Sequence, residues 1–201
     1  MADKTSIANM TFAHCGISQV VTNIDASSET STEVDQFNAF YDTVLEAVLM
    51  QWMPDFAQKQ ETLNLIQENP NLTWSYEYTY PSDCLLATGI TDGSRLGVDA
   101  FAEVEYQVSN NGSDRVIWTN ESAASLDYVH NFAVVSKMPS SFALAFSYIM
   151  AGHIAPSITE NRNSGQALAK RGEMEMAKAM AGQYNERGRA PQADAEVIRG
   201  R

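Results

Sequence analysis

Two cysteines and three histidines are the residues of this sequence best suited to covalent or metal chemistry. Cys84 with His130 or His153 and an Asp would form the active site of a small cysteine hydrolase. His14 and Cys15 are adjacent, and adjacent residues on a helix do not face each other. The three histidines show no HxH or HxxxH spacing, which argues against a metal site.

The simpler interpretation of these residues is structural. The two cysteines match no metal or redox spacing and are expected to be reduced, buried thiols. The sequence also contains no GxxxxGK[ST] or GxGxxG loop that would cradle a phosphate. We therefore expect no catalytic site, no metal site and no cofactor, and the protein is expected not to be an enzyme.

The stretch TWSYEYTYPSDCLLATGI, residues 73–90, carries aromatic rings at alternate positions before a proline. With one indole from a later strand they form a candidate interface set: Trp74, Tyr76, Tyr78, Tyr80 and Trp118. Burying one ring stabilises by up to about 4–6 kcal/mol, whereas stacking one base returns about 1–3 kcal/mol and needs a cationic groove. No Lys or Arg lies between Lys59 and Arg95. We expect these rings in the core or at an interface with a neighbouring subunit or tail protein.

The charge of the chain is divided unevenly. The 201 residues have a formal net charge of −12 and are 44% apolar, a composition that permits a sizeable core. Residues 1–161 contain 5 Lys and Arg against 20 Asp and Glu, a balance of −15, and residues 162–201 contain 8 against 5, a balance of +3. The acidic body counts against nucleic-acid binding. An acidic body with a basic end indicates two surfaces with different partners.

Membrane and secretion signals are not evident. No apolar run of about 18 residues predicts a transmembrane helix. The opening residues MADKTSIANM lack the basic start and apolar stretch of a secretory signal. We expect assembly in the cytoplasm and no membrane partner.

Helical spacing marks the start of the chain. Residues 5–16 predict a short helix that stops at Gly16. A second, longer helix is expected to begin near Ser28, with Thr30 and Glu33 as a capping box. Pro54 is expected to end or kink it.

The middle of the chain changes to the period of strands, and the end returns to helices. Strands are expected around residues 74–80, 102–108, 116–118 and 124–128, with SNNGSD as a hairpin connection. A helix is expected from Ser140, limited by Pro156. A last helix is expected over 160–184, although three glycines weaken it.

These elements predict an α+β protein. Helices from both ends form a bundle, an antiparallel β domain is inserted between them, and an extended arm follows. The expected divisions are 1–60 (helical), 61–128 (β-rich), 129–185 (helical) and 186–201 (flexible C-terminal docking arm). The candidate docking residues are mostly basic: Lys170, Arg171, Lys178, Arg187, Arg189, Val197, Ile198, Arg199 and Arg201.

The order of several short motifs resembles the head–tail adaptor (connector) proteins of tailed bacteriophages, the tail tubular protein A family. The most specific motif is YTYPSDCL, residues 78–85, which lies within the match of residues 76–85 to the family pattern Y-x-Y-x-Y-P-x-D-C-L. At the helix-to-strand turn, Pro54 stands where the family has Trp. The full set lies over about residues 5–160: Ile7 to Gly16, Asp25 to Glu29, Tyr41-Asp42, Phe56-Ala57, Tyr76 to Leu85, Ile117 to Asn120 and Ile154 to Thr159.

This resemblance implies a structural virion protein rather than an enzyme. Copies would form a dodecameric ring below the portal, as a homo-oligomer in the neck of the virion. The basic C-terminal segment would dock on the portal protein, and the far side would receive the next tail protein, a nozzle or tube. DNA would pass through the lumen during ejection without specific binding.

Two other functions are compatible with the sequence. A single-stranded nucleic-acid-binding β module with helical flanks would use the aromatic strand for stacking. A neck or tail-completion protein of a long-tailed phage would share the helices but have another neighbour. The cysteine hydrolase described above requires a reactive Cys84.

Overall fold

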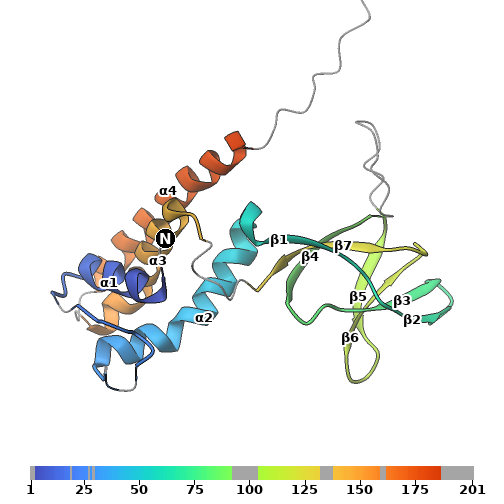
Figure 1. Ribbon diagram of the computed structural model, residues 1–201, viewed down its shortest axis with the longest axis horizontal. Coiled ribbons are helices and arrows are strands. Elements are labelled where there is room, and N and C mark those ends of the chain that lie inside the picture. The colour runs from blue at the N-terminus through green and yellow to red at the C-terminus, as the bar shows by residue number, and fades with distance from the viewer. Residues whose placement is uncertain are drawn as a thin grey trace, which may run out of the picture.

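A computed structural model describes residues 3–18, 20–26, 28, 30–91, 104–131, 138–158 and 162–186 of the 201-residue chain. Within these residues the protein has a helical half and a β half, which lie side by side along its long axis (Figure 1). The helices come from both ends of the described chain and the strands from its middle, so the predicted α+β class is confirmed. The strands extend from Gln58 to His130, compared with the predicted 61–128.

The two N-terminal helices begin at polar caps. Helix α1 (Lys4–His14) begins at Asp3, whose side chain accepts a hydrogen bond from the Ser6 backbone N–H at 2.6 Å. The chain turns away at Gly16 with φ of 78°, as predicted. Helix α2 (Thr32–Trp52) begins at Ser31, whose hydroxyl accepts from the Val34 N–H at 3.4 Å.

The predicted start of the second helix is wrong. Ser31 rather than Thr30 is the N-cap, and the residue three positions later is Val34, so Thr30 and Glu33 form no capping box. The predicted end is correct, because Met53 adopts a left-handed conformation with φ of 44° directly before Pro54.

Helices α3 (Ser140–Ile158) and α4 (Arg162–Glu186) form an antiparallel hairpin with close backbone contact. A Cβ atom on Gly172 would lie 2.8 Å from the Ile149 backbone nitrogen, and one on Gly165 would lie 2.7 Å from the Pro156 ring. Two of the three glycines that weaken the helix prediction, Gly165 and Gly172, thus permit the packing of α4. Pro156 does not stop α3, which continues to Ile158.

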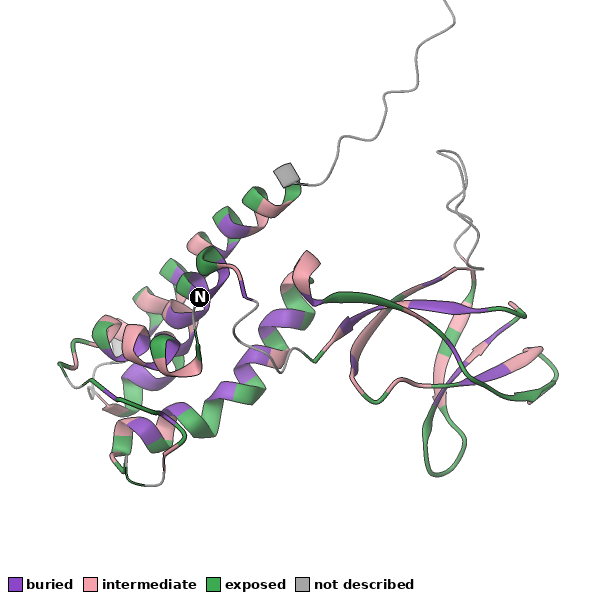
Figure 2. Ribbon diagram, in the orientation of Figure 1, coloured by how far each residue is buried: buried purple, intermediate pink, exposed green. Residues whose placement is uncertain are grey.

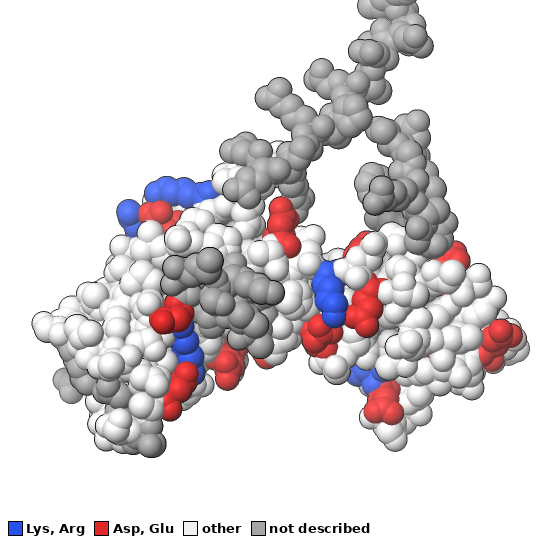
Figure 3. Space-filling model, viewed as in Figure 1, with Lys and Arg blue, Asp and Glu red and all other residues white. Residues whose placement is uncertain are grey.

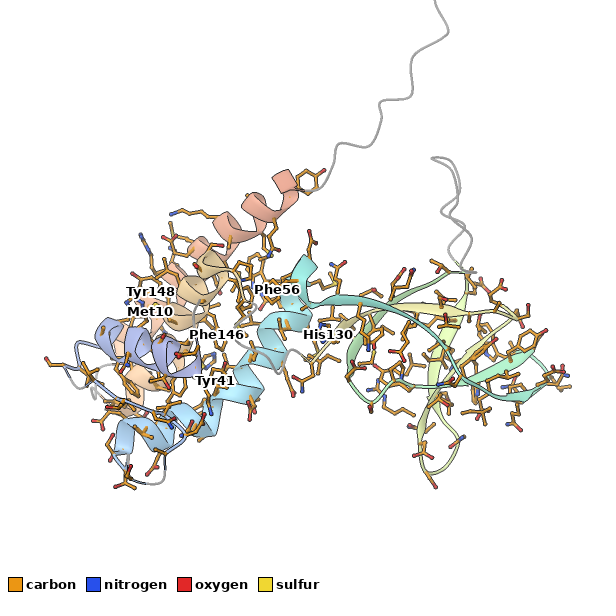
Figure 4. All side chains as sticks on the ribbon, viewed as in Figure 1. Met10, Tyr41, Phe56, His130, Phe146 and Tyr148 are labelled. Carbon is orange, nitrogen blue, oxygen red and sulfur yellow. The ribbon has the colours of Figure 1, made fainter. Side chains whose placement is uncertain are left out.

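Helix α3 is the central helix of the bundle and contacts α1, α2 and α4. By length and composition alone it is the one helix among the described residues able to cross a membrane, and 50% of its apolar window is buried within the protein. Its buried aromatic residues pack against the other helices. Phe146 meets the Tyr41 ring edge-on at 5.7 Å between centroids, and both are labelled in Figure 4.

Two antiparallel sheets make up the β half. The first contains β1 (Gln58–Thr62), β7 (Ser125–His130) and β4 (Cys84–Thr91), in the order β1-β7-β4. The second contains β2 (Leu65–Glu68), β3 (Tyr76–Thr79), β6 (Arg115–Thr119) and β5 (Tyr106–Asn110), in the order β2-β3-β6-β5. The predicted hairpin between β5 and β6 is present, and Gly112 has φ of 108° there.

Several strand limits differ from the predictions. The aromatic strand is shorter than predicted, because only Tyr76–Thr79 pairs with its neighbours. The strand predicted over 102–108 begins at Tyr106, and residues 102–103 lie outside the described part. Strand β1, QKQET, was not predicted, since it is polar and mostly exposed and shows no hydrophobic alternation.

Each half has its own apolar core, and Figure 2 shows buried positions in both halves. A small contact joins the halves. Val129 of β7 is fully buried and belongs to the helical core. Phe56, in the short 3₁₀ turn Asp55–Ala57, packs edge-on against Phe142 with ring centroids 4.8 Å apart. The Asn131 amide donates to Glu46 of α2 at 3.3 Å.

Candidate protein-binding surfaces

The tyrosines of the aromatic strand line the inner face of the second sheet. Tyr78 is 2% exposed, and its hydroxyl donates to the Glu121 backbone oxygen at 2.9 Å. Tyr76 and Tyr80 are partly buried against the same apolar cluster. Tyr78 therefore belongs to the core of its own chain, which corrects its assignment to an interface.

The opposite face of this sheet carries a row of polar and indole side chains. Gln67, Glu77, Trp118 and Gln107 are successive partners across the four strands. Directly paired residues of neighbouring strands project to the same face. This face lies opposite Tyr78, because side chains alternate along a strand.

Glu77 is the buried charge of this outer face. It is 2% exposed and accepts three hydrogen bonds, from Gln67 Nε2 at 3.0 Å, Asn111 Nδ2 at 3.0 Å and Trp118 Nε1 at 3.1 Å. Burial raises the pKa of Glu77, but the three donors together bring this pKa below its usual value of 4.5. The carboxylate is held ionised by neutral donors.

Trp118 and Trp74 supply the apolar surface of this face. Both side chains are partly exposed, and the Trp74 indole N–H donates to Gln107 at 3.3 Å. Because each indole is fixed by a hydrogen bond, ordering it on binding costs little entropy. Partly exposed Trp side chains are enriched in protein interfaces.

The same sheet is poor in cations. Arg115 is the sole Lys or Arg in its four described strands, and its guanidinium stacks 4.1 Å from the Tyr80 ring centroid. A base-binding sheet needs cations free to follow a phosphate backbone. This arrangement suits a protein partner better than a nucleic acid.

Strand β2 presents an apolar edge. All four of its residues are exposed, and β2 is an end strand of the sheet. Leu65 and Ile66 are 49% and 45% exposed, and Leu72 in the following loop is fully exposed. An edge strand with exposed apolar side chains is a template for pairing with another chain.

A cluster of charged side chains connects the strands of the first sheet. Lys59 pairs with Glu61 at 2.8 Å and with Asp83 at 3.0 Å. The Tyr128 hydroxyl lies 2.8 Å from Asp83 and 3.0 Å from Glu61. The pKa of Glu61 is lowered by hydrogen bonds from Lys59 and Tyr128. These contacts tie β1 and the turn before β4 to β7.

The cysteines are poorly suited to nucleophilic chemistry. Burial raises the pKa of the Cys84 thiol, and it raises that of Cys15 to about 11. Cys84 and His130 are cross-strand partners in β4 and β7, whereas His153 lies on α3, stacked with Phe40. Among the described residues, no group of three His, Cys, Asp or Glu side chains is arranged to hold a metal ion.

His14 has a packing role. Its ring stacks on Tyr148 at 3.7 Å between centroids, and its Nε2 lies 3.1 Å from the Ser147 hydroxyl. Burial lowers the pKa of His14 below its usual value of 6.5. The neutral ring therefore joins α1 to α3.

The candidate docking residues divide into two groups. Lys170, Arg171 and Lys178 lie on α4, which packs against α3. Arg171 and Lys178 pair with the same Glu175 oxygen, at 2.8 Å and 3.0 Å. The others lie outside the described residues: Arg187, Arg189, Val197, Ile198, Arg199 and Arg201.

Helix α2 is the acidic counterpart of α4. It contains Glu33, Asp35, Asp42 and Glu46 and no Lys or Arg. Figure 3 shows basic side chains, with acidic ones beside them, over α4 at one edge of the helical half, and mostly acidic side chains toward the opposite edge, near α2.

The comparisons with known proteins add no family. No family model matches this chain, and no curated protein matches its sequence. The surfaces described above are therefore interpreted from their own chemistry.

Sequence patterns gave no sign of the Glu77 network. Gln67, Glu77 and Gln107 are ordinary polar residues of half-exposed strands. Their convergence depends on strand register, which joins residues far apart in the chain. The weak available signal was the Glu between Tyr76 and Tyr78, a charge in an otherwise aromatic strand.

Proposed function

We propose that this protein is a structural adaptor in the neck of a tailed bacteriophage. Copies form a ring, a dodecamer by resemblance to the tail tubular protein A family, between the portal protein and the next tail protein. In this role the protein catalyses no reaction. Its place is the virion, and it is assembled in the host cytoplasm.

The observation that supports this proposal most is the division of the chain into two halves with separate cores. An adaptor must offer different surfaces to different neighbours. The β half presents two indoles and an apolar edge strand, and the helical half presents oppositely charged edges. Such surfaces suit protein contacts.

The acidic body is consistent with a conduit for DNA. Residues 1–161 have a balance of −15. Carboxylates lining a lumen repel a passing polyanion within a Debye length of about 8 Å, which keeps DNA from adhering. DNA accordingly passes without specific binding.

Docking to the portal is assigned to the C-terminal segment after α4. This segment carries Arg187, Arg189, Arg199 and Arg201, with Val197 and Ile198 as a small apolar element. A basic segment that wraps an acidic surface fits ring-on-ring assembly.

The test is electron microscopy of the purified protein mixed with the portal protein of the same phage. The expected result is an added ring of density on one end of the portal. A portal that gains no density overturns the proposal. Retention on single-stranded DNA at moderate salt would instead favour the nucleic-acid-binding alternative.

A further inference from the structure

The outer side of α4 has a repeating pattern. The residues of α4 buried against the bundle include Gly165, Gly172 and Met176. Arg171, Met174 and Lys178 follow each other at steps of three and four on the exposed side. Met174 is 49% exposed, and the side chains of Arg171 and Lys178 are 53% and 64% exposed. An apolar side chain therefore lies between two cations.

This side of α4 keeps an excess of positive charge. Arg171 and Lys178 both pair with Oε1 of Glu175, whose side chain is 15% exposed. One carboxylate balances only one of the two cations. Arg171 is also held in place, because its guanidinium lies 5.9 Å from the Tyr148 ring centroid.

The outer side of α2 has the opposite charge and the same repeat. Asp35, Asp42 and Glu46 lie along one line of the helix, since they are seven and four residues apart. The exposed Ala39 lies on the same side, and α2 contains no Lys or Arg. These carboxylates have no cation on their own helix to balance them.

The two surfaces match in spacing. Asp35 and Asp42 are seven residues apart, as are Arg171 and Lys178. On a helix that separation is about 10.5 Å for either pair. Two helices packed side by side would bring both cations to both carboxylates, with Met174 against the small Ala39.

We propose that the protein associates head to tail, with the Arg171–Met174–Lys178 side of α4 on one copy packed on the Asp35–Ala39–Asp42 side of α2 on the next. Helices α4 and α2 lie on opposite sides of the helical half (Figure 1), so each copy can contact two neighbours. A contact between two different surfaces repeats and closes into a ring when the rotation allows. As the contact within the proposed adaptor ring, this inference rests on the proposed function. It assigns Arg171 and Lys178 to the neighbouring copy rather than to the portal.

The first experiment is sedimentation velocity over a concentration series at low salt. Three proteins are compared: the wild type, Arg171→Glu/Lys178→Glu and Asp35→Lys/Asp42→Lys. The wild type is expected to gain mass with concentration. Each double variant is expected to bind itself roughly tenfold or more weakly, because like charges then face each other. Glu105→Lys/Asp114→Lys, with two exposed carboxylates of the β half changed outside strand β2, is the matched control and should associate like the wild type.

Mixing the two double variants gives the sharpest result. In the mixture, the acidic α4 side of Arg171→Glu/Lys178→Glu can pack on the basic α2 side of Asp35→Lys/Asp42→Lys. The unchanged acidic α2 side of Arg171→Glu/Lys178→Glu can likewise pack on the unchanged basic α4 side of Asp35→Lys/Asp42→Lys. The equimolar mixture should regain association that neither variant shows alone. Thermal melting of each variant alone checks that it is folded.

A cross-linking variant detects the contact even if association is too weak for sedimentation. Ala39→Cys/Met174→Cys should give a ladder of disulfide-linked copies on oxidation, whereas the wild type, with buried Cys84 and half-buried Cys15, should not. A wild type that stays monomeric together with no ladder overturns the inference. So does a mixture that fails to regain association.

The outcomes separate the inference from the proposed function. If the wild type and all variants associate equally, the α4–α2 contact is wrong while the adaptor stands. If the α4–α2 contact is confirmed but the portal gains no density, the proposed adaptor function is wrong and the contact between copies remains supported.

Discussion

The Trp118 indole N–H donates a hydrogen bond to the Glu77 carboxylate at 3.1 Å, and the two residues are direct cross-strand partners. The carboxylate is almost fully buried, yet its donors are neutral: an indole and the amides of Gln67 and Asn111. The donors come from β2, β6 and the β5–β6 hairpin. One carboxylate thus links β2, β3, β6 and the β5–β6 hairpin and holds an indole in position on the outer face.

The first prediction concerns this donor. Trp118→Phe keeps an aromatic ring but leaves the buried carboxylate short of one hydrogen bond. It should lower the free energy of unfolding by about 1–3 kcal/mol, measured by urea denaturation. Trp74→Phe is the control, because Trp74 donates to an exposed Gln107, and its effect should stay within about 0.5 kcal/mol. Equal losses in both variants would contradict the special role of Glu77.

The second prediction follows from the pKa of Glu77. Burial raises this pKa and the three hydrogen bonds bring it below 4.5. The unfolded chain therefore binds the proton more readily than the folded one. The stabilisation is fully present above the unfolded pKa and is lost as the pH falls through the folded pKa. Glu77→Gln should melt below the wild type near neutral pH, and the difference in Tm should shrink in acid. A constant difference would contradict this.

The elements predictable from the sequence are those set by local pattern. The apolar stripe of α2 and the hairpin around Gly112 depend on near neighbours in the chain, and both are present in the structure. The start of α2 was predicted wrongly because Ser28, Thr30 and Ser31 are all suitable caps, and the local pattern does not choose among them.

The remaining features depend on contacts between distant residues. Strand β1 is an edge strand, paired on one side with β7, and its residues are polar and mostly exposed. Its sequence therefore lacks the alternation of apolar and polar residues that would predict a strand. Tyr78 and Trp118 are both aromatic residues of strands, yet one is in the core and the other is on the outer face. Only the register of β3 and β6 distinguishes them.

The third prediction uses the glycines of α4. In an isolated helix Gly→Ala stabilises by about 1 kcal/mol. At Gly172 the added methyl would lie 2.8 Å from the Ile149 backbone, so Gly172→Ala should instead destabilise by about 1–3 kcal/mol. Gly182 has no atom within 4 Å of the added methyl, and Gly182→Ala should stabilise by about 0.4–1 kcal/mol. The sign of the two changes in Tm is the measurement, and a gain in both would show that α4 does not pack as described.

The fourth prediction tests the cap of α2. Ser31→Ala removes the hydroxyl that accepts from the Val34 N–H and should cost about 0.5–2 kcal/mol. Thr30→Ala changes a neighbouring exposed residue that is not the cap, and should have little effect. Chemical denaturation of both variants shows whether Ser31 or Thr30 is the N-cap. A larger decrease in the free energy of unfolding for Thr30→Ala would support the capping box expected from the sequence.

The fifth prediction concerns the basic segment after α4. Residues 187–201 carry only Val197 and Ile198 as large apolar side chains, so their removal should leave the Tm nearly unchanged. The shortened protein should no longer be captured by the portal, because the segment carries Arg187, Arg189, Arg199 and Arg201. Capture of the full chain should weaken with added salt, since exposed charges are screened beyond about 8 Å at physiological ionic strength.

A full-length variant with these four arginines changed to Ser separates charge from length in that test. If charge carries the docking, this variant should fail to bind the portal in pull-down as completely as the shortened chain does. If Val197 and Ile198 carry it, the Ser variant should bind and its capture should be insensitive to salt, because burial of apolar surface is not screened. Normal capture of the shortened chain would remove the segment from the docking model and leave the β half as the candidate surface for the portal.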